Sequence, residues 1–373
     1  ITLIVAALFV SLQNRYIGNV DLGFNKENVL EVRLSMGAAL KKGELFKARL
    51  LESPAIRDVS FSEFKFVSDE SRSFIGYNYK GQHYYMSWLG VSANFPELMD
   101  VKMIAGRKFR PTDEAADNTQ VVCLLSETAA REIASGLSPE KLDDLSDLVG
   151  TSITDNDIPV RIVGIFEDVH YESLYKELRP MGLWTSAKNH YRRSVPERYA
   201  YVKIAGGNPR TAIEHIRKVT DELIPGYPAD IHFFDTALEE LYSKSGRQGA
   251  LITALCLMAV FLSLVGVFGL VIFELQGREK EIAVRKVHGS TVRQILWMLN
   301  SSFLRITLVC FIISIPLAYY GVNVWLRSFA YKTPIYIWVF LVALVIIMTL
   351  TVSTVTFQSY RAAMANPASK LGH

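Results

Sequence analysis

The sequence predicts a helical membrane protein that carries a two-lobed α+β domain outside the bilayer. Two observations predict this fold class: long apolar runs in the last third of the chain, and a patterned polar region before them. The runs cover about residues 250–274, 303–326 and 335–357. At about 1.5 Å of helix rise per residue, each run can cross a bilayer core roughly 30 Å thick. Because unpaired backbone amides are costly in hydrocarbon, we expect these runs to be transmembrane helices.

A fourth and shorter apolar run lies at the start of the chain, over residues 1–12. It is too short to span a bilayer unaided, and the chain begins with Ile1 rather than Met. We therefore interpret residues 1–20 as a truncated transmembrane helix followed by a stalk. This interpretation predicts four transmembrane helices in total, the first of them cut short.

The loops between the runs predict the orientation in the membrane. Basic side chains crowd residues 277–293, whereas the short loop 327–334 holds only Arg327 and Lys332. The positive-inside bias makes the first loop cytoplasmic and the second external. Residues 21–240 then form an extracytoplasmic domain, and both chain ends lie inside. The net charge of +3 points to no particular partner, and nucleic-acid binding is not suggested.

The external region has the patterning of a folded α+β domain. Residues 29–34 alternate in polarity, with Leu30 and Val32 on one face and Glu31 and Arg33 on the other, which predicts a half-buried strand. Further strands are predicted over residues 74–79, 84–91, 121–125, 160–166 and 199–204.

Two helix starts are also predicted. Asn208 followed by Pro209 is typical of an N-cap and a first helical position, and the helix would run to about Leu223. Asp235 can cap a helix that begins at Thr236 and continues unbroken into the first long apolar run. The outer part of that helix would be a second stalk between the membrane and the external domain.

The external domain is predicted to have two lobes. The stretch of about 111–196 begins and ends at prolines and includes an acidic, turn-rich piece, so we interpret it as a lobe inserted into the first. Cys123 is the only cysteine of the external region, and no disulfide can form within it. The domain must therefore be held together by its hydrophobic core.

The segment GREKEIAVRKVHGS, residues 277–290, resembles the cytoplasmic segment of MacB/FtsX-type permeases of ABC transporters. Further similarity lies in residues 22–30, 93–109, 160–174 and 360–371. The stretch that leads from the first apolar run into LGFN looks like the second half of double-length members, which repeat this unit twice. The resemblance thus covers nearly the whole chain and implies a MacB-like periplasmic core domain followed by an FtsX-like transmembrane domain over residues 241–373.

The resemblance implies a permease without enzymatic activity or cofactor of its own. In this family a separate ABC ATP-binding subunit binds ATP, docks on the cytoplasmic segment and drives the external domain through the stalks. The sequence agrees, since it contains no G-x-x-x-x-G-K-S/T phosphate loop. The other partners implied are a second permease half or protomer and the lipid bilayer. The location implied is the bacterial cytoplasmic (inner) membrane.

Residues 276–299 are the predicted ATPase-coupling segment. Gly289 and Ser290 suggest a bend between two short helices, with Ser290 as the cap of the second. The residues expected to couple to the ATPase are Glu279, Glu281, Arg285, Lys286, Gly289, Ser290, Val292 and Ile295. The first four would meet the ATPase, whereas Val292 and Ile295 would lie against the membrane or a docking groove. The alternative is that the basic residues only hold the topology against anionic lipid.

Other chemistry-bearing residues do not favour a catalytic or metal site. Four residues have side chains of the metal-ligating types: Glu167, Asp168, His170 and Glu172. They fall in a segment that resembles one of the family, and the family segment binds no metal. Nothing in the sequence places a histidine beside Cys123 as a base.

Two function classes therefore stand. In the first, the chain is a mechanotransmission permease that exports or releases a peptide, a drug or a lipoprotein. In the second, it is a membrane-anchored sensor or scaffold for an antimicrobial peptide or for cell-wall regulation, without transport. A neighbouring coding sequence for an ATP-binding subunit alone favours the first class, and an added histidine kinase favours the second.

Overall fold

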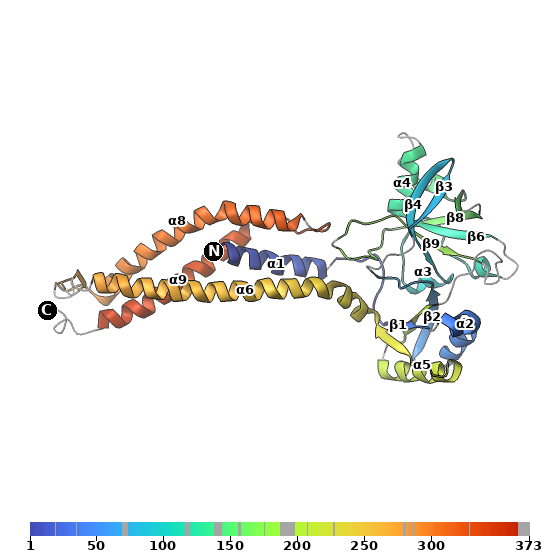
Figure 1. Ribbon diagram of the computed structural model, residues 1–373, viewed down its shortest axis with the longest axis horizontal. Coiled ribbons are helices and arrows are strands. Elements are labelled where there is room, and N and C mark those ends of the chain that lie inside the picture. The colour runs from blue at the N-terminus through green and yellow to red at the C-terminus, as the bar shows by residue number, and fades with distance from the viewer. Residues whose placement is uncertain are drawn as a thin grey trace. The chain divides into compact units, whose positions relative to one another are not determined.

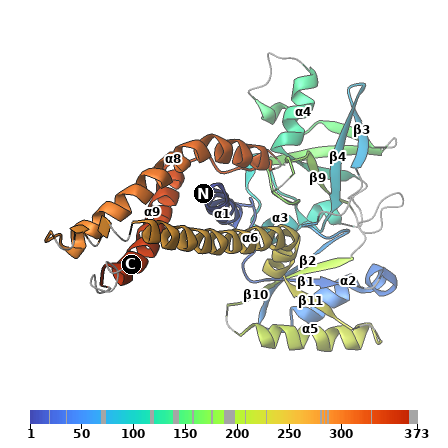
Figure 2. The same cartoon turned by 60° about the vertical axis from the view of Figure 1, so that its left-hand side comes forward.

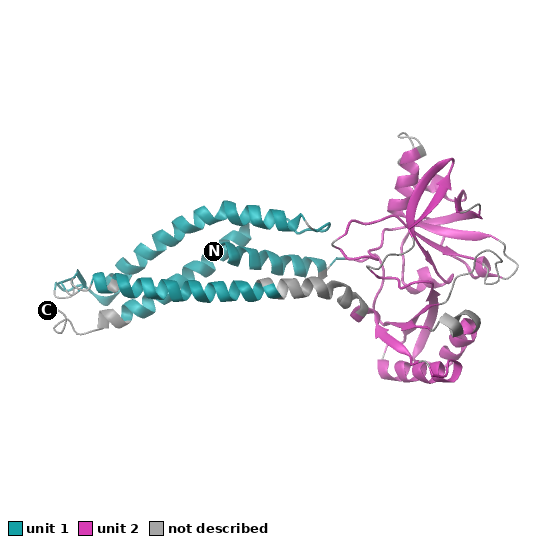
Figure 3. Ribbon diagram, viewed as in Figure 1, with its two compact units in different colours: residues 1–20, 244–373 teal, residues 21–243 magenta. Residues whose placement is uncertain are grey.

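The chain divides into two compact units, residues 1–20 with 244–373 and residues 21–243 (Figure 3). The computed structural model describes every residue except 19, 35, 69–73, 116–119, 138–143, 156–157, 175, 187–197, 207, 227, 279–280, 283, 286–287, 328 and 365–373. Both units have hydrophobic cores of their own.

The first unit is helical. Its main helices in the described part of the chain are α1 (Thr2–Gly18), most of α6 (Phe234–Gly277), α8 (Val292–Leu326) and α9 (Ile337–Met364) (Figure 1). Three stretches are long and apolar enough to cross a membrane: Thr253–Glu274, Val292–Leu326 and Ile337–Tyr360. The three long apolar runs are thus helices, as the sequence predicts. α1 contains a shorter apolar helical stretch, and its Val5 and Phe9 are buried against side chains of α8 and α9.

Gln13 ties α1 to the loop between α8 and α9. Its side chain is fully buried. Its Nε2 donates to the carbonyl oxygen of Tyr331 at 2.7 Å, and its Oε1 accepts from the backbone N–H of Thr333 at 2.8 Å. Backbone groups of a non-helical loop need such partners where an apolar bundle keeps water away.

We expect Gln13→Leu to destabilise the protein by about 2–6 kcal/mol, because it removes the partner of two backbone groups, each worth about 1–3 kcal/mol. Thermal unfolding of the full chain in detergent measures the loss. Asn14→Leu is the matched control, since Asn14 is the exposed neighbour on the same helix. Equal stability of the two variants would contradict this role of Gln13.

The second unit begins with a four-stranded antiparallel sheet in the order β11-β1-β10-β2. Its elements are β1 (Val29–Arg33), β2 (Ile56–Ser62), β10 (Tyr199–Ile204), β11 (Asp230–Phe233), α2 (Met36–Leu50) and α5 (Pro209–Leu223). The two helices lie on one side of the sheet, as Figure 2 shows, and contribute Phe46, Leu50 and Ile216 to its core. Asn208 caps α5 by accepting from the N–H of Arg210, as predicted.

Glu31 of β1 was expected on an exposed face, but it is only 4% exposed. The prediction was wrong because both faces of β1 are covered. Lys65 Nζ lies 3.3 Å from one carboxylate oxygen of Glu31, and the Tyr201 hydroxyl donates to the other at 3.2 Å. Burial raises the pKa of Glu31, and the nearby Lys65 charge opposes this shift.

The second lobe is a seven-stranded sheet in the order β5-β8-β6-β9-β4-β3-β7, and β7 also pairs with β8. Its strands are β3 (Phe74–Tyr79), β4 (Gln82–Gly90), β5 (Met103–Gly106), β6 (Val121–Ser126), β7 (Ser152–Asp155), β8 (Ile158–Phe166) and β9 (Met181–Thr185). The lobe therefore already includes Phe74, the first residue of β3, and does not begin at about residue 111. The predicted boundary was wrong because β4 pairs with β9, and β5 with β8, across a long stretch of sequence.

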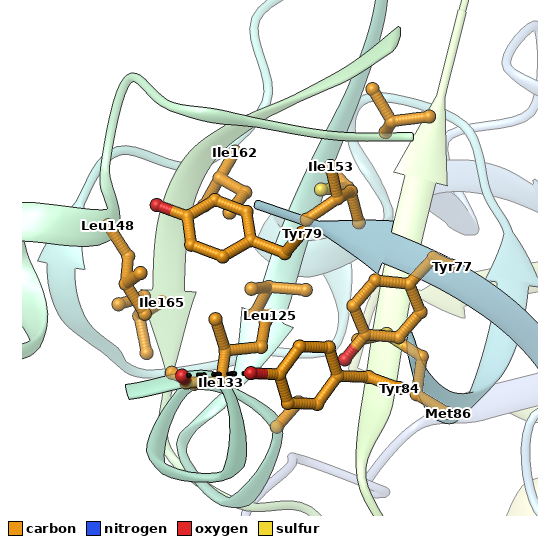
Figure 4. Close-up of a cluster of buried hydrophobic side chains, with 14 of the residues drawn as sticks. Tyr77, Tyr79, Tyr84, Met86, Leu125, Ile133, Leu148, Ile153, Ile162 and Ile165 are labelled. Atoms are coloured by element: carbon orange, nitrogen blue, oxygen red, sulfur yellow. Dashed lines mark hydrogen bonds between the residues drawn. The ribbon is translucent and has the colours of Figure 1, made fainter. Parts of the chain in front are cut away.

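The core of this lobe joins the curved sheet to α4 (Glu127–Leu137). Figure 4 shows the rings of Tyr77, Tyr79 and Tyr84 among aliphatic side chains from the facing elements. The Tyr84 hydroxyl donates to Gln82 Oε1 at 2.7 Å and lies 3.4 Å from the carbonyl oxygen of Ile133 in α4. The side chains of α4 thus complete the core that the strands enclose.

Five aromatic rings of the second unit form one cluster, and we call them the aromatic junction: Phe24, Phe66, Phe95, Tyr201 and Phe234. The centroids of Phe66 and Phe24 are 5.0 Å apart, and those of Phe66 and Phe95 are 5.1 Å apart. Phe234 is the first residue of α6, and Phe24 follows α1 by a few residues. The segment that follows α1 and the first residue of α6 therefore both contribute a ring to this cluster.

We expect residues 21–243 to fold alone as a soluble domain that is insensitive to reductant. The unit has its own cores, and its single cysteine, Cys123, is a buried free thiol. Urea unfolding with and without dithiothreitol should give superimposable, cooperative curves. An insoluble or unfolded product would show that the helical unit completes the core.

Candidate coupling segment

A short helical segment with a well-defined end links α6 to α8. The backbone N–H of Ile282 donates to the Arg278 carbonyl at 2.9 Å, so helical bonding continues past Gly277. The segment ends at Gly289, whose φ of +84° lies in the left-handed region that glycine adopts readily. The N–H of Ser290 then donates to the carbonyl of Arg285 at 3.0 Å, as in a Schellman motif. The bend expected at Gly289 is present.

The cap of the next helix is Thr291, not Ser290. The Thr291 hydroxyl accepts from the N–H of Gln294, and Gln294 Oε1 accepts from the N–H of Thr291 at 2.9 Å. This reciprocal pair is a capping box, which needs Ser or Thr three residues before Glu or Gln. The prediction of Ser290 as the cap was wrong, because the residue three positions after it is Arg293 and not Glu or Gln. The N–H of Ser290 instead forms the last hydrogen bond of the preceding helix.

The second short helix that the sequence suggested is the first part of α8, which continues from Val292 to Leu326 without a break. The predicted span began at about residue 303. Continuity past residue 303 follows from the composition, since no glycine or proline occurs between Val292 and Pro316, which itself lies inside the helix.

Ile295 is 2% exposed and does not lie on a free surface. It packs with Ile282 of the coupling segment, Val271 of α6, Leu299 of α8 and Val355 of α9. The expectation that Ile295 faces lipid or a docking groove was wrong for this reason, whereas Val292 is half-buried. Sequence reasoning missed Ile282; its signal was an isoleucine within a strongly charged helix.

The charged side chains of the segment remain accessible. Glu281 and Arg285 form an ion pair of 2.8 Å, with side chains 43% and 50% exposed. A second pair of the same spacing joins Glu274 and Arg278 at 2.7 Å. Glu279 and Lys286, which were also expected to couple, lie outside the described residues.

The residues that could have formed a metal or nucleophile site have structural surroundings instead. Asp168 accepts from the N–H and the hydroxyl of Thr128, at 2.9 and 2.7 Å, and so caps α4. Glu172 lies 3.9 Å from Arg179 Nε. Burial raises the pKa of the Cys123 thiol, which disfavours the reactive thiolate. Within the described ranges, no group of three or more His, Cys, Asp or Glu could hold a metal ion.

These features define a class of protein: a multi-span membrane protein with an extracytoplasmic two-lobed domain and a short charged segment packed under its membrane helices. Comparison with known families agrees. The MacB-like periplasmic core domain matches residues 3–219, and the C-terminal domain of FtsX-like permeases matches residues 253–367. The chain belongs to the MacB/FtsX-type ABC transporter permeases.

Individual relatives are distant. The chain is 23% identical over 237 residues to the "Probable syringafactin export ATP-binding/permease protein SyfD" of Pseudomonas syringae pv. tomato; the match covers 62% of the chain and 33% of the relative. The chain thus spans about a third of that protein's length.

Solved structures of extracytoplasmic domains are also similar. The periplasmic region of MacB from Actinobacillus actinomycetemcomitans is 16% identical with a TM-score of 0.42; the match covers 60% of this chain and 97% of that one. The extracellular domain of the transporter YknZ from Gram-positive bacteria is 12% identical with a TM-score of 0.39. The match covers 55% of this chain and 100% of that one.

Proposed function

We propose that this chain is a permease subunit that couples ATP hydrolysis by a partner ABC ATP-binding subunit to movement of its extracytoplasmic domain. The observation that carries the proposal is the burial of Ile282 against α6, α8 and α9. Through this contact a force on the charged segment would reach three membrane helices at once. α6 would carry it directly to the domain, since it begins at Phe234 in the aromatic junction.

The coupling surface of the proposal is the exposed side of the segment, with Glu281 and Arg285 at its centre. Gly289 would set its angle to α8, because the left-handed turn there directs the chain into the Thr291 cap. Ile295 would hold Ile282 in place by packing against it in the buried cluster and would not contact the ATPase.

The proposal extends to the setting of the protein. α1 would be a fourth membrane helix, supported by the burial of Val5 and Phe9 against the other helices. The protein would act in the bacterial inner membrane with a second permease half or protomer. Export is the activity that the name of the relative SyfD supports, and the cargo would be a peptide, a drug or a lipoprotein.

The test is purification of the tagged full chain from its native membrane in mild detergent. We expect an ATP-binding protein to co-elute and its ATPase activity to rise in the presence of the chain. Co-elution of a histidine kinase without any ATPase stimulation would instead support the sensor class and contradict energised transport.

A further inference from the structure

Polar side chains of α8 and α9 border the apolar cluster that holds Ile282. α6, α8 and α9 come together around this cluster, at the end of the helical unit that carries the coupling segment (Figure 1). Leu299 of α8 and Val355 of α9 belong to the cluster. The next residue of each helix is polar, Asn300 in α8 and Thr356 in α9.

Two side-chain amides bond α9 to its neighbours at this level. Asn300 Nδ2 donates to Thr356 Oγ1 at 3.0 Å, and also to the carbonyl oxygen of Leu296 in its own helix at 3.0 Å. Gln358 Nε2 of α9 donates to the carbonyl oxygen of Phe268 in α6 at 3.1 Å. Thr356 and Gln358 are two positions apart in one helix, so they lie about 200° apart around its axis. The two bonds therefore hold α9 from different sides.

Each of these amides is paired at one end only. Asn300 and Gln358 are 9% and 7% exposed, and their side-chain oxygens have no hydrogen-bond partner among the described residues. Because a carbonyl oxygen can only accept, the carbonyls of Leu296 and Phe268 identify the nitrogen end of each amide as the paired one. A buried polar atom without a partner lowers stability, and an apolar pair of the same size avoids that loss. Stability alone therefore does not account for the two amides.

A buried hydrogen bond supplies a fixed register, which apolar packing does not. Apolar side chains of two helices can pack at several heights, whereas a buried polar pair forms at one of them. Neighbouring heights of packed helices differ by one helical turn, or about 5 Å. Register matters at this level of the bundle, because Ile282 of the coupling segment packs on α6, α8 and α9 together.

We propose that Asn300 and Gln358 are positioning residues that set the register of α8 and α6 against α9, so that a movement of the coupling segment reaches the three helices as one unit. The role in coupling rests on the proposed function, whereas the role in register does not. An interhelical hydrogen bond within a membrane biases an equilibrium by about threefold to 15-fold. Loss of either bond should raise the population of a slipped register by this factor, and for one pair of helices only.

The test measures two distances by electron paramagnetic resonance in the full chain in nanodiscs, with spin labels at exposed positions. Trp297→Cys with Ser353→Cys reports the distance between α8 and α9. Phe273→Cys with Ser353→Cys reports the distance between α6 and α9. Cys310→Ala removes the exposed native thiol from both.

Two variants remove the bonds one at a time. Thr356→Val should add a second α8–α9 distance, from helices that have slipped by one turn, and should leave the α6–α9 distance single. Gln358→Met should do the reverse. Thr356→Ser keeps the hydroxyl and should behave as the unchanged chain.

The matched control is Thr349→Val, in the same helix. Thr349 is exposed, and its hydroxyl donates to the carbonyl oxygen of Val345 in its own helix at 2.8 Å, so its loss should change neither distance. Single distances in Thr356→Val and Gln358→Met, as in this control, overturn the proposal.

The coupling role is tested in the complex with the co-eluting ATP-binding protein. Thr356→Val with Gln358→Met should retain ATPase binding and thermal stability, yet lower ATPase stimulation at least about tenfold, the product of two such biases. Normal stimulation in this double variant overturns the coupling role. If no ATP-binding protein co-elutes with the unchanged chain, the proposed function fails instead, and the two distances still decide the register role.

Discussion

Exchanging the charges of one ion pair, as Glu281→Arg with Arg285→Glu, is expected to abolish ATPase stimulation while expression and membrane insertion stay normal. The net charge does not change, and an exposed pair within one helix contributes only about 0.3–0.5 kcal/mol to stability. A charge that a partner desolvates can contribute about 2–5 kcal/mol to binding, so the affinity should fall by roughly 30-fold to 4000-fold. Co-purification and ATP hydrolysis measure the effect.

The matched control is the exchange Glu127→Arg with Arg131→Glu in α4. This pair has the same order and spacing and a separation of 2.7 Å, but it lies in the extracytoplasmic domain. The control should bind and stimulate the ATPase as the unchanged chain does. If the exchange at 281 and 285 behaves like this control, the charged segment serves only as a topology signal.

Truncating the central ring of the aromatic junction, Phe66→Ala, should lower the free energy of unfolding of the extracytoplasmic domain by about 3–5 kcal/mol. Phe66 is fully buried, and its ring meets those of Phe24, Phe95 and Phe234 with centroids 5.0, 5.1 and 6.3 Å away. The cavity cannot close easily, because these rings belong to separate parts of the chain. Urea unfolding of residues 21–243 measures the change.

Phe74→Ala is the control for this substitution. Phe74 is 49% exposed and stacks on Tyr85 with centroids 6.3 Å apart, so its truncation should cost at most about 1.5 kcal/mol. Comparable losses in the two variants would show that the junction is not tightly packed.

The candidate site was predictable only in part. Gly289 marked the end of the charged helix because few other residues adopt a positive φ without strain. Thr291 was missed, although the spacing to Gln294 was in the sequence, because Ser290 offered the same hydroxyl one residue earlier. Ile282 and Ile295 could not be paired from sequence, since their contact depends on how α6, α8 and α9 come together.

By itself the sequence determined the three apolar membrane helices, the strand and helix segments of the external domain, and the charged segment between two helices. These features depend on local composition and periodicity, which the chain carries wherever it folds. Only the tertiary structure decided that the second lobe starts by Phe74, that Glu31 is buried, and that Ile295 anchors Ile282. Each of these depends on pairing between residues far apart in the chain, and no local pattern specifies which distant strand or helix will cover a given face.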